Sequence, residues 1–296
     1  MSSVSTKPYI GRFAPSPSGP LHFGSLVTAL ASYLQAKSRD GQWLVRIEDI
    51  DPPREVEGAA EVILKTLEIH GLLWDQEVSY QSSHSAYYED ALSLLADTKL
   101  TYYCQCTRQE IKARGGQYDG FCRDRNLSPE GSSVRLRNNA KVASFNDVLQ
   151  GRVSLDSLSA DEDFVVKRKD KLYAYQLAVV VDDARQGITE VIRGCDLLRA
   201  TFHQLCLFSA LKETPPTYGH IPVVASSAGM KLSKQNKAKA IANSQAVDNL
   251  YQAMTFLGLS PDDSLKQATV DELLQWAVSQ WNMSCVPATS EIIWKP

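Results

Sequence analysis

One segment near the N-terminus, RFAPSPSGPLHFGS from Arg12 to Ser25, constrains the fold of this chain most strongly. A short extended run ends there, and a loop rich in proline, serine and glycine follows it. A helix is predicted to begin near His22, because apolar residues then recur at helical spacing, at Leu26, Leu30, Tyr33 and Leu34. The N-terminus of a helix presents free amide groups and partial positive charge, which suit a phosphate. The segment therefore predicts a phosphate-binding loop or, as the plainer alternative, a tight turn with a surface histidine.

The residues that follow alternate between strand and helix patterns. Gly41 ends the first helix, and residues 42–49 form an apolar run typical of a strand. Residues 51–71 and 84–99 have helical patterns, the first with prolines at its entry and Gly71 at its exit. Such alternation predicts an α/β fold built on a parallel sheet, whose ligands bind at the carboxyl ends of the strands.

A change of pattern at Tyr102 indicates an insertion. Cysteine, glycine and basic residues replace the periodic helices, and the stretch from Arg108 to Arg137 holds seven Lys and Arg but four Asp and Glu. Strand patterns return in residues 163–183, with RKDK as a hairpin turn, and short helical patterns close the chain. We therefore expect two halves of one α/β domain, at residues 1–101 and 164–240. The insertion between them would comprise residues 102–163, and a small helical C-terminal domain would follow at residues 241–296.

Composition restricts the cellular compartment. The longest aliphatic run, Leu177 to Val181, is far shorter than the roughly 20 residues of a membrane helix. The start, MSSVSTKPY, lacks the basic and then apolar pattern of a signal peptide. Six unevenly spaced cysteines in 296 residues do not suit a disulfide scaffold, so we expect a reduced, cytoplasmic protein without membrane association. The net charge of −3 gives no global attraction for nucleic acid, although a local basic face is compatible with it.

A second candidate for phosphate binding is KLSKQ, at residues 231–235. Lys231 and Lys234 lie on a predicted loop after a strand, where two cations could clamp phosphate charge. Alone, such a segment is usually a solvated basic loop. Combined with the HFGS segment at the ends of the same sheet, each element supports the other.

The motifs RFAPSPSGPLHFG, LVRIEDID, VIRG and KLSK occur in the order found in class I glutamyl-tRNA synthetases, and from about Tyr9 to Gln235 the chain resembles the catalytic half of that family. HFGS stands where the family has its HIGH signature, and KLSKQ stands where it has KMSKS. The resemblance implies a Rossmann-type catalytic domain that uses ATP, with Mg²⁺, to activate L-glutamate as glutamyl-adenylate.

The same resemblance implies roles for individual residues. His22 would stabilise the phosphate charge of the transition state, and Lys234 would stabilise the β- and γ-phosphates as they leave. Arg12 and Arg193 would hold the side-chain carboxylate of glutamate, a task that suits a planar guanidinium. The full implied set is, for glutamate, Arg12, Phe13, Ala14, Pro15, Ser16, Glu48 (for the ammonium group), Tyr175 and Arg193, and, for ATP, His22, Gly24, Lys231 and Lys234. Asp49 and Asp51 are better explained as ordinary caps before Pro52.

A cluster of cysteines in the insertion suggests a metal site. Cys104, Cys106 and Cys122 offer three thiolates, whereas zinc takes four ligands and none of the five histidines lies nearby. The pattern, with Tyr118 in fourth place, is close to that of the glutamyl-queuosine tRNA(Asp) synthetases, which implies one structural zinc held by Cys104, Cys106, Tyr118 and Cys122. The alternative is three buried, reduced cysteines without a metal.

That subfamily resembles a truncated glutamyl-tRNA synthetase, and this chain ends about sixty residues after its KLSK motif. We therefore expect no anticodon-binding part, and transfer of glutamate to the queuosine base in the anticodon of tRNA(Asp). The expected partners are tRNA(Asp) bearing queuosine, L-glutamate and ATP, with no obligate protein partner. The basic insertion and Lys237 and Lys239 are candidate RNA contacts.

Three other functions stay open at this point. The chain could be a minimal glutamyl-tRNA synthetase that charges the tRNA 3′ end, a catalytically silent tRNA-binding paralogue, or a nucleotidyltransferase of the HxGH type. Retention of the implied catalytic and glutamate-binding residues argues against the last two. We assign structural roles to the other candidates: Cys195, Cys206, Cys285, Trp276 and Trp281 in the core, and Asp182 and Asp183 after a buried strand, as caps or near a ribose.

Overall fold

The computed structural model describes residues 8–231 and 239–294. Its centre is a parallel sheet, in which β1 (Ile10–Phe13) pairs with β2 (Gln42–Ile47) and β2 pairs with β3 (Ser79–Tyr80). On the other side of β1, the amide of Thr189 donates a hydrogen bond of 2.9 Å to the carbonyl of Ile10. This contact brings β9 (Glu190–Gly194) beside β1, and β9 pairs in parallel with β10 (Thr217–Ile221). The predicted α/β fold with a parallel sheet is confirmed.

The helix α1 (Phe23–Lys37) follows β1 and packs on the sheet, where most of its side chains are buried. It begins directly after His22, its N-cap, because the side chains of His22 and Ser25 each accept a hydrogen bond from the other's backbone amide, which is a capping box. At the other end, the amides of Ser38 and Gly41 bond to the carbonyls of Leu34 and Ala36. The strand, loop and helix predicted for this segment are therefore present.

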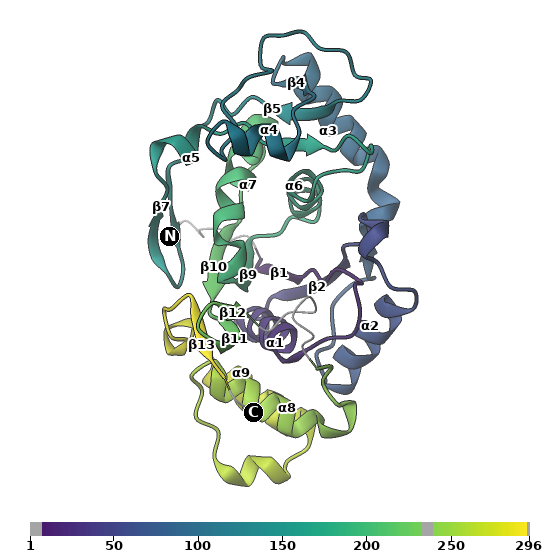
Figure 1. Cartoon of the computed structure of the whole chain (residues 1–296). Helices are drawn as coiled ribbons and strands as arrows, with labels where there is room; N and C mark the ends of the chain where they lie inside the picture. The colour runs from purple at the N-terminus through teal and green to yellow at the C-terminus, as the bar shows by residue number, and fades with distance from the viewer. Residues whose placement is uncertain (1–7, 232–238, 295–296) are drawn as a thin grey trace, which may run out of the picture.

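The remaining helices surround the sheet (Figure 1). One core lies between α1, the sheet and the two C-terminal helices, and a second joins α3, α6 and α7. Figure 1 shows the first part of the insertion, around α4, and the C-terminal helices at opposite ends of the molecule. The helices are α2 (Ala59–Ile69), α3 (Ser85–Asp97), α4 (Arg108–Ala113), α5 (Ser157–Asp161), α6 (Tyr175–Arg185), α7 (Leu198–Leu211), α8 (Ala246–Phe256) and α9 (Val270–Gln280).

The insertion contributes to two sheets. An antiparallel sheet joins β4 (Thr101–Cys104), β5 (Ser133–Leu136) and β8 (Val165–Lys167). The hairpin of β6 (Ser144–Asp147) and β7 (Gly151–Ser154) instead pairs with β10 in the sheet that holds β9. Side chains of α8 and α9 share the core of α1. The four-part division of the chain stays a prediction.

A further small sheet lies beside α1. Its strands are β11 (Val223–Ser227), β12 (Met230–Lys231) and β13 (Glu291–Ile293). The strand β12 leads toward residues 232–238, and on their far side Ala240 forms a backbone bridge with His22. The downstream flank of the KLSK segment is therefore attached beside the N-terminal cap of α1.

Two predictions of secondary structure were wrong. Residues 175–185 form the helix α6 rather than a strand, since a short run of buried apolar residues is compatible with either structure and β-branched valines favoured the strand. The helix predicted for residues 51–71 starts at Ala59, after Gly58 in the left-handed conformation (φ 74°), while the prolines form a separate 3₁₀ turn, Pro52–Arg54. The RKDK turn between β8 and Tyr173 is present.

The residues predicted to be structural are mostly inside. Trp281 and Cys206 are buried, and Trp276 and Cys195 are partly buried, but Cys285 is exposed, so the prediction for Cys285 was wrong. Within the described part of the chain, each helix is too short or too polar to cross a lipid bilayer.

Candidate active site

A cavity of about 510 Å³ opens where β1, β2 and β9 end and α1 begins. This is the edge of the sheet at which parallel α/β folds bind ligands. The cavity brings together every residue predicted for glutamate and two of those predicted for ATP, namely Arg12, Phe13, Ala14, Pro15, Ser16, Glu48, Tyr175, Arg193, His22 and Gly24. Lys234 lies outside the described residues, and only the backbone of Lys231 is described.

His22 lies at the N-terminus of α1, on the cavity wall. Its Nδ1 accepts a hydrogen bond of 3.3 Å from the amide of Ser25. A neutral imidazole that accepts through Nδ1 carries its proton on Nε2. The capping box therefore sets the tautomer in which Nε2 is a donor, beside a helix N-terminus that favours anions.

Arg12 is held in the cavity wall by a buried aspartate. Its Nε and Nη2 each donate a hydrogen bond of 3.2 Å to the carboxylate of Asp183 on α6. Arg46, on β2, forms an ion pair with the same carboxylate, with Nη1 2.8 Å from Oδ1. Burial acts to raise the pKa of Asp183, but Arg12 and Arg46 outweigh burial and hold it below its usual range. One carboxylate thus fixes two buried guanidinium groups.

The neighbouring Asp182 accepts hydrogen bonds from a different set of side chains. Its carboxylate accepts hydrogen bonds of 2.7–2.8 Å from Gln81, His84 and Tyr88, and lies 3.7 Å from Nε of Arg46. Both aspartates are buried in α6, so neither follows a strand, and the predicted roles as caps or ribose contacts give way to a role in holding arginines. In the sequence, a pair of aspartates at the end of an apolar run could have indicated buried ion pairs, since buried charges need partners.

Glu48 lies just after β2, with 8% of its surface exposed. Burial raises the pKa of Glu48 to about 7, although the nearby Arg46 and Arg12 act to lower it. The nearest ion pair joins Oε1 of Glu48 to Nη2 of Arg46 at 3.6 Å. The carboxylate is therefore poised between its charged and neutral forms near neutral pH.

Arg193, at the end of β9, is a buried cation with 3% of its surface exposed. Its Nη2 donates to Thr201 and Gln204 of α7 at 2.8 and 2.7 Å. Its Nη1 is buried and has no hydrogen-bond partner among the described residues. A fully ionised guanidinium with an unpartnered donor in a cavity wall is suited to an anionic ligand.

Asp49 and Asp51 bind neighbouring residues, but neither side chain caps the turn that begins at Pro52, so the predicted role as caps there was wrong. The carboxylate of Asp49 accepts hydrogen bonds from the amide and hydroxyl of Ser82, at 2.8 and 2.6 Å. Asp51 pairs with Arg54 and with Arg168. Neither lines the cavity of about 510 Å³.

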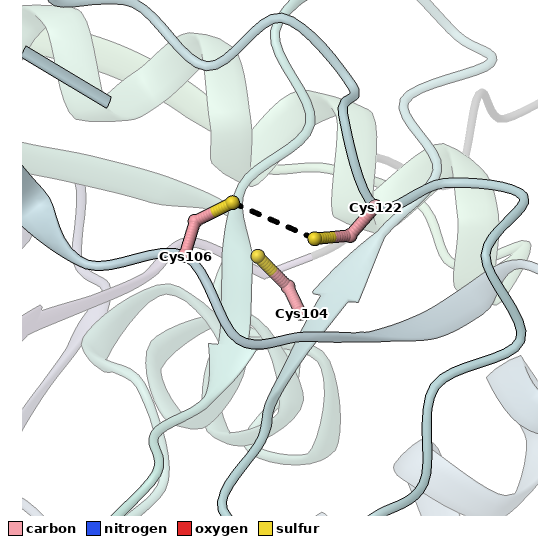
Figure 2. Close-up of side chains that lie close together, drawn as sticks. All are labelled: Cys104, Cys106 and Cys122. Carbon is pink, nitrogen blue, oxygen red and sulfur yellow. Dashed lines mark hydrogen bonds between the residues drawn. The ribbon is translucent and has the colours of Figure 1, made fainter. Parts of the chain in front are cut away.

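The three cysteines of the insertion converge on one point (Figure 2). Their sulfur atoms all lie within 4.8 Å of one another, and those of Cys106 and Cys122 are 3.5 Å apart. A tetrahedral zinc ion with bonds of about 2.3 Å holds its sulfur ligands about 3.8 Å apart. Cys104, Cys106 and Cys122 could therefore hold one metal ion.

Tyr118 packs in the same cluster. Its hydroxyl accepts a hydrogen bond of 2.9 Å from the amide of Cys122, and the Arg135 guanidinium lies 3.7 Å from its ring centre. Burial raises the pKa of Tyr118, so a phenolate would need a cation beside it. Tyr118 is placed near the cysteines, and its role as a ligand stays a prediction.

A second cavity, of about 700 Å³, lies where the insertion meets α3. Its lining includes the aromatic rings of Tyr102 and Tyr103. Among the described residues that line it, Glu89 is the sole acidic one, against five cations, Arg123, Arg137, Lys167, Arg168 and Lys171. Tyr103 is exposed and Tyr102 is partly buried, and four of these cations, Arg123, Arg137, Lys167 and Arg168, each pair with a carboxylate. A groove with an excess of cations and an exposed ring is compatible with a surface for RNA.

Comparison with known proteins gives one consistent result. The family model of the tRNA synthetases class I (E and Q), catalytic domain, matches residues 10–262. The Glutamyl-Q tRNA(Asp) synthetase of Colwellia psychrerythraea is 54% identical, and the match covers 96% of this chain and 94% of that protein. The protein of the same name from Pectobacterium atrosepticum is 50% identical, over 97% of this chain and 89% of that protein.

Among solved structures, a glutamate tRNA ligase from Elizabethkingia meningosepticum, in complex with its amino acid, superposes with a TM-score of 0.79. It is 25% identical in sequence, and the match covers 96% of this chain. The match spans 66% of the length of that ligase, so the likeness concerns part of the larger protein.

Proposed function

The chain belongs to the class I tRNA synthetases, among the glutamyl-Q tRNA(Asp) synthetases, and from this premise we propose its reaction and the roles of its residues. The enzyme activates L-glutamate with ATP and transfers it to the queuosine base in the anticodon of tRNA(Asp). The observation that carries the proposal is the cavity in which Arg12, Glu48 and Arg193 meet the N-terminus of α1. These groups match an amino acid with two carboxylates, next to a phosphate.

The glutamate subsite combines two guanidinium groups with one carboxylate. Nε and Nη2 of Arg12 donate to Asp183, which leaves Nη1 as a donor for substrate. In Arg193, Nη1 likewise has no partner among the described residues. These donors would bind the side-chain carboxylate of glutamate. Glu48 would hold the ammonium group, and Tyr175 would line the same space. Phe13, Ala14, Pro15 and Ser16 would form its backbone wall.

The ATP subsite would lie at the start of α1. Gly24 permits a close approach of the phosphates, and His22 would donate through Nε2 to the α-phosphate. An oxygen of the glutamate α-carboxylate attacks that phosphorus, the bond to the β-phosphate oxygen breaks, and pyrophosphate leaves. Lys231 and Lys234 would neutralise its charge. ATP enters with its Mg²⁺, as is usual for a nucleoside triphosphate.

The second step would use a hydroxyl of queuosine. The hydroxyl oxygen attacks the carbonyl carbon of the adenylate and forms an ester bond. The hydroxyl group loses its proton, the bond between the carbonyl carbon and the phosphate oxygen breaks, and AMP leaves. Queuosine carries a cyclopentenediol whose vicinal hydroxyls resemble those of a terminal ribose. The second cavity, of about 700 Å³ between the insertion and α3, would contact the RNA backbone together with Lys239. The binding of tRNA should therefore weaken as the salt concentration rises.

The cysteine cluster would hold one zinc ion through Cys104, Cys106, Cys122 and Tyr118. Zinc would supply a structural cross-link there, because it would join the end of β4 to the loop after α4. Burial raises the pKa of Cys106 to about 11, whereas Arg114, which donates to its sulfur at 3.1 Å, acts to lower it toward the thiolate that a metal requires. The free cysteines also agree with a reducing, cytosolic location.

The alternative product is glutamate on the 3′-terminal adenosine. The likeness to a glutamate tRNA ligase favours it as the second candidate, since both reactions would pass through the same adenylate. The acceptor distinguishes the two functions.

Pyrophosphate exchange tests the activation step. With glutamate, and without tRNA, the protein should exchange labelled pyrophosphate into ATP. Aspartate and glutamine should not replace glutamate, because one is too short and the other lacks the charge that Arg12 and Arg193 would bind. Exchange that is absent without tRNA, or equal for glutamine, would contradict the proposed activation step or its subsite.

Activation should also depend on pH through Glu48. The carboxylate is charged above its pKa of about 7, and only the charged form would hold the substrate ammonium. We expect kcat/KM for glutamate to fall about tenfold per pH unit below this value. In Glu48→Gln, kcat/KM should be low and this limb should vanish. A limb that persists in the variant belongs to another group and would contradict the role given to Glu48.

Metal analysis tests the zinc site. Freshly prepared, chelator-free protein should contain one zinc per chain, and Cys104→Ser or Cys122→Ser should lose it and expose the insertion to proteases. Cys285→Ser is the matched control, because this cysteine is exposed and far from the cluster in sequence. Metal-free wild-type protein would refute the site. Full zinc affinity in Tyr118→Phe would remove only the tyrosine from the ligands.

A further inference from the structure

Behind Arg193 lies a buried polar pair that none of the sequence motifs includes. His220, on β10, and Asp147, at the end of β6, are both buried, and Nδ1 of His220 lies 2.6 Å from Oδ2 of Asp147. On the other side of the ring, Nε2 of His220 lies 3.1 Å from Nε of Arg193. The three side chains form a line from the β6–β7 hairpin to the wall of the cavity.

The partners determine the state of His220. Nε of Arg193 can only donate, so Nε2 of His220 must accept, and Nδ1 must carry the proton that is donated to Asp147. Burial lowers the pKa of His220, which keeps the ring neutral and able to accept. Asp147 cannot easily turn away, because its Oδ1 accepts hydrogen bonds from the amides of Leu149, Gln150 and His220, at 2.9–3.1 Å.

The contacts of Arg193 differ from those of Arg12. Arg12 is bound by a carboxylate, whereas the hydrogen-bond partners of Arg193 among the described residues are His220, Thr201 and Gln204, all neutral. These partners occupy Nε and Nη2 and leave Nη1. A buried cation without a counter-ion is costly. The arrangement thus holds an oriented charge in the cavity wall, and its remaining buried donor has no partner among the described residues.

We propose that His220 and Asp147 are positioning residues for Arg193, and that they set the preference for an amino acid with a side-chain carboxylate. The inference rests on the proposed function, since it takes glutamate as the ligand of Arg193. Asp147 fixes the tautomer of His220, and His220 fixes the guanidinium plane without neutralising its charge. A direct carboxylate partner would satisfy the arginine and weaken its attraction for substrate. The hairpin of β6 and β7 thereby contributes to amino-acid selection.

Two substitutions at position 220 separate positioning from packing. The amide of Asn reaches the place of Nδ1 and can still bond to Asp147, but it leaves Nε of Arg193 without an acceptor. The longer Gln can place its carbonyl oxygen near the position of Nε2. We expect His220→Asn to raise KM for glutamate about 10- to 100-fold, the usual effect of one hydrogen bond to a charged group, with kcat and KM for ATP essentially unchanged. His220→Gln should restore much of the loss.

The matched control is His70→Asn. His70 is equally buried, with Nδ1 2.8 Å from the carbonyl of Thr66 and Nε2 3.1 Å from the amide of Asn249, and it does not line the cavity. This variant should lower the unfolding temperature without changing KM for glutamate. The full measurement is pyrophosphate exchange and calorimetric binding of glutamate and glutamine to the full chain, for the wild type and the three variants.

The outcomes are distinct. A rise in KM that is specific to glutamate, with reduced preference for glutamate over glutamine and rescue by Gln, supports the inference. If the wild type selects glutamate and His220→Asn selects it equally well, the inference is wrong while the proposed function stands. Equal losses for glutamate and ATP, as in a loosened fold, also overturn the inference. If the wild type binds no glutamate, the proposed function fails and the inference falls with it.

Discussion

tRNA(Asp) that lacks queuosine should accept no glutamate above background, whereas queuosine-bearing tRNA(Asp) should be charged to near completion. The physical reason is the nucleophile. Guanosine at the same position offers no hydroxyl on its base, so a bound adenylate would have no acceptor even if the anticodon loop docked normally. Unpaired loop bases are also what proteins usually read in RNA. The measurement is incorporation of labelled glutamate, followed by nuclease digestion to locate the label.

Two substrates separate the anticodon from the 3′ end. Queuosine-bearing tRNA(Asp) without its terminal adenosine should still be charged, and an unmodified transcript with an intact 3′ end should not. Unmodified tRNA(Glu) serves as a further control. If the truncated tRNA is inert, or if the label lies at the 3′ end, the enzyme is a glutamyl-tRNA synthetase of minimal size and the proposed acceptor is wrong. The exchange reaction would be unaffected by that outcome.

Asp183→Asn should destabilise the protein by about 3–5 kcal/mol, the usual result of removing one member of a buried ion pair. The substitution removes the carboxylate that accepts two hydrogen bonds from Arg12 and forms an ion pair with Arg46, and both guanidinium groups are almost wholly buried. Urea unfolding measures the change. Any folded fraction should bind glutamate weakly, since Arg12 would lose its orientation.

Asp263→Asn is the control for this experiment. Its carboxylate pairs with Lys266 on the surface, with 84% of the side chain exposed, and should leave the unfolding transition unchanged, because such pairs contribute little. Asp182→Asn should also be costly, as it removes the acceptor of Gln81, His84 and Tyr88. An Asp183→Asn protein with wild-type stability would show that the two arginines do not depend on this carboxylate.

The sequence was informative wherever chemistry and local structure coincide. The apolar spacing after His22 and the capping residues set the position of α1, and the loop before it set the backbone wall of the cavity. Arg12, Glu48 and Arg193 each stand near the carboxyl end of a different parallel strand, so the sheet alone brings them to one edge. The three clustered cysteines come from the end of β4, the residues just after it and the loop after α4, which are close together in the sequence.

What only the tertiary structure decided is how those side chains are held. The run Leu177 to Val181 has no periodicity that separates a buried helix from a buried strand, and α6 is a helix because it packs between α3 and α7. Arg12 and Asp183 are separated by 171 positions, and Asp147 and His220 by 73, so local sequence carries no sign that they pair. The sequence by itself determined which chemical groups reach the cavity. Their tautomers, partners and charges follow from burial, because a charged or polar group removed from water must find its partner in space, wherever the chain supplies one.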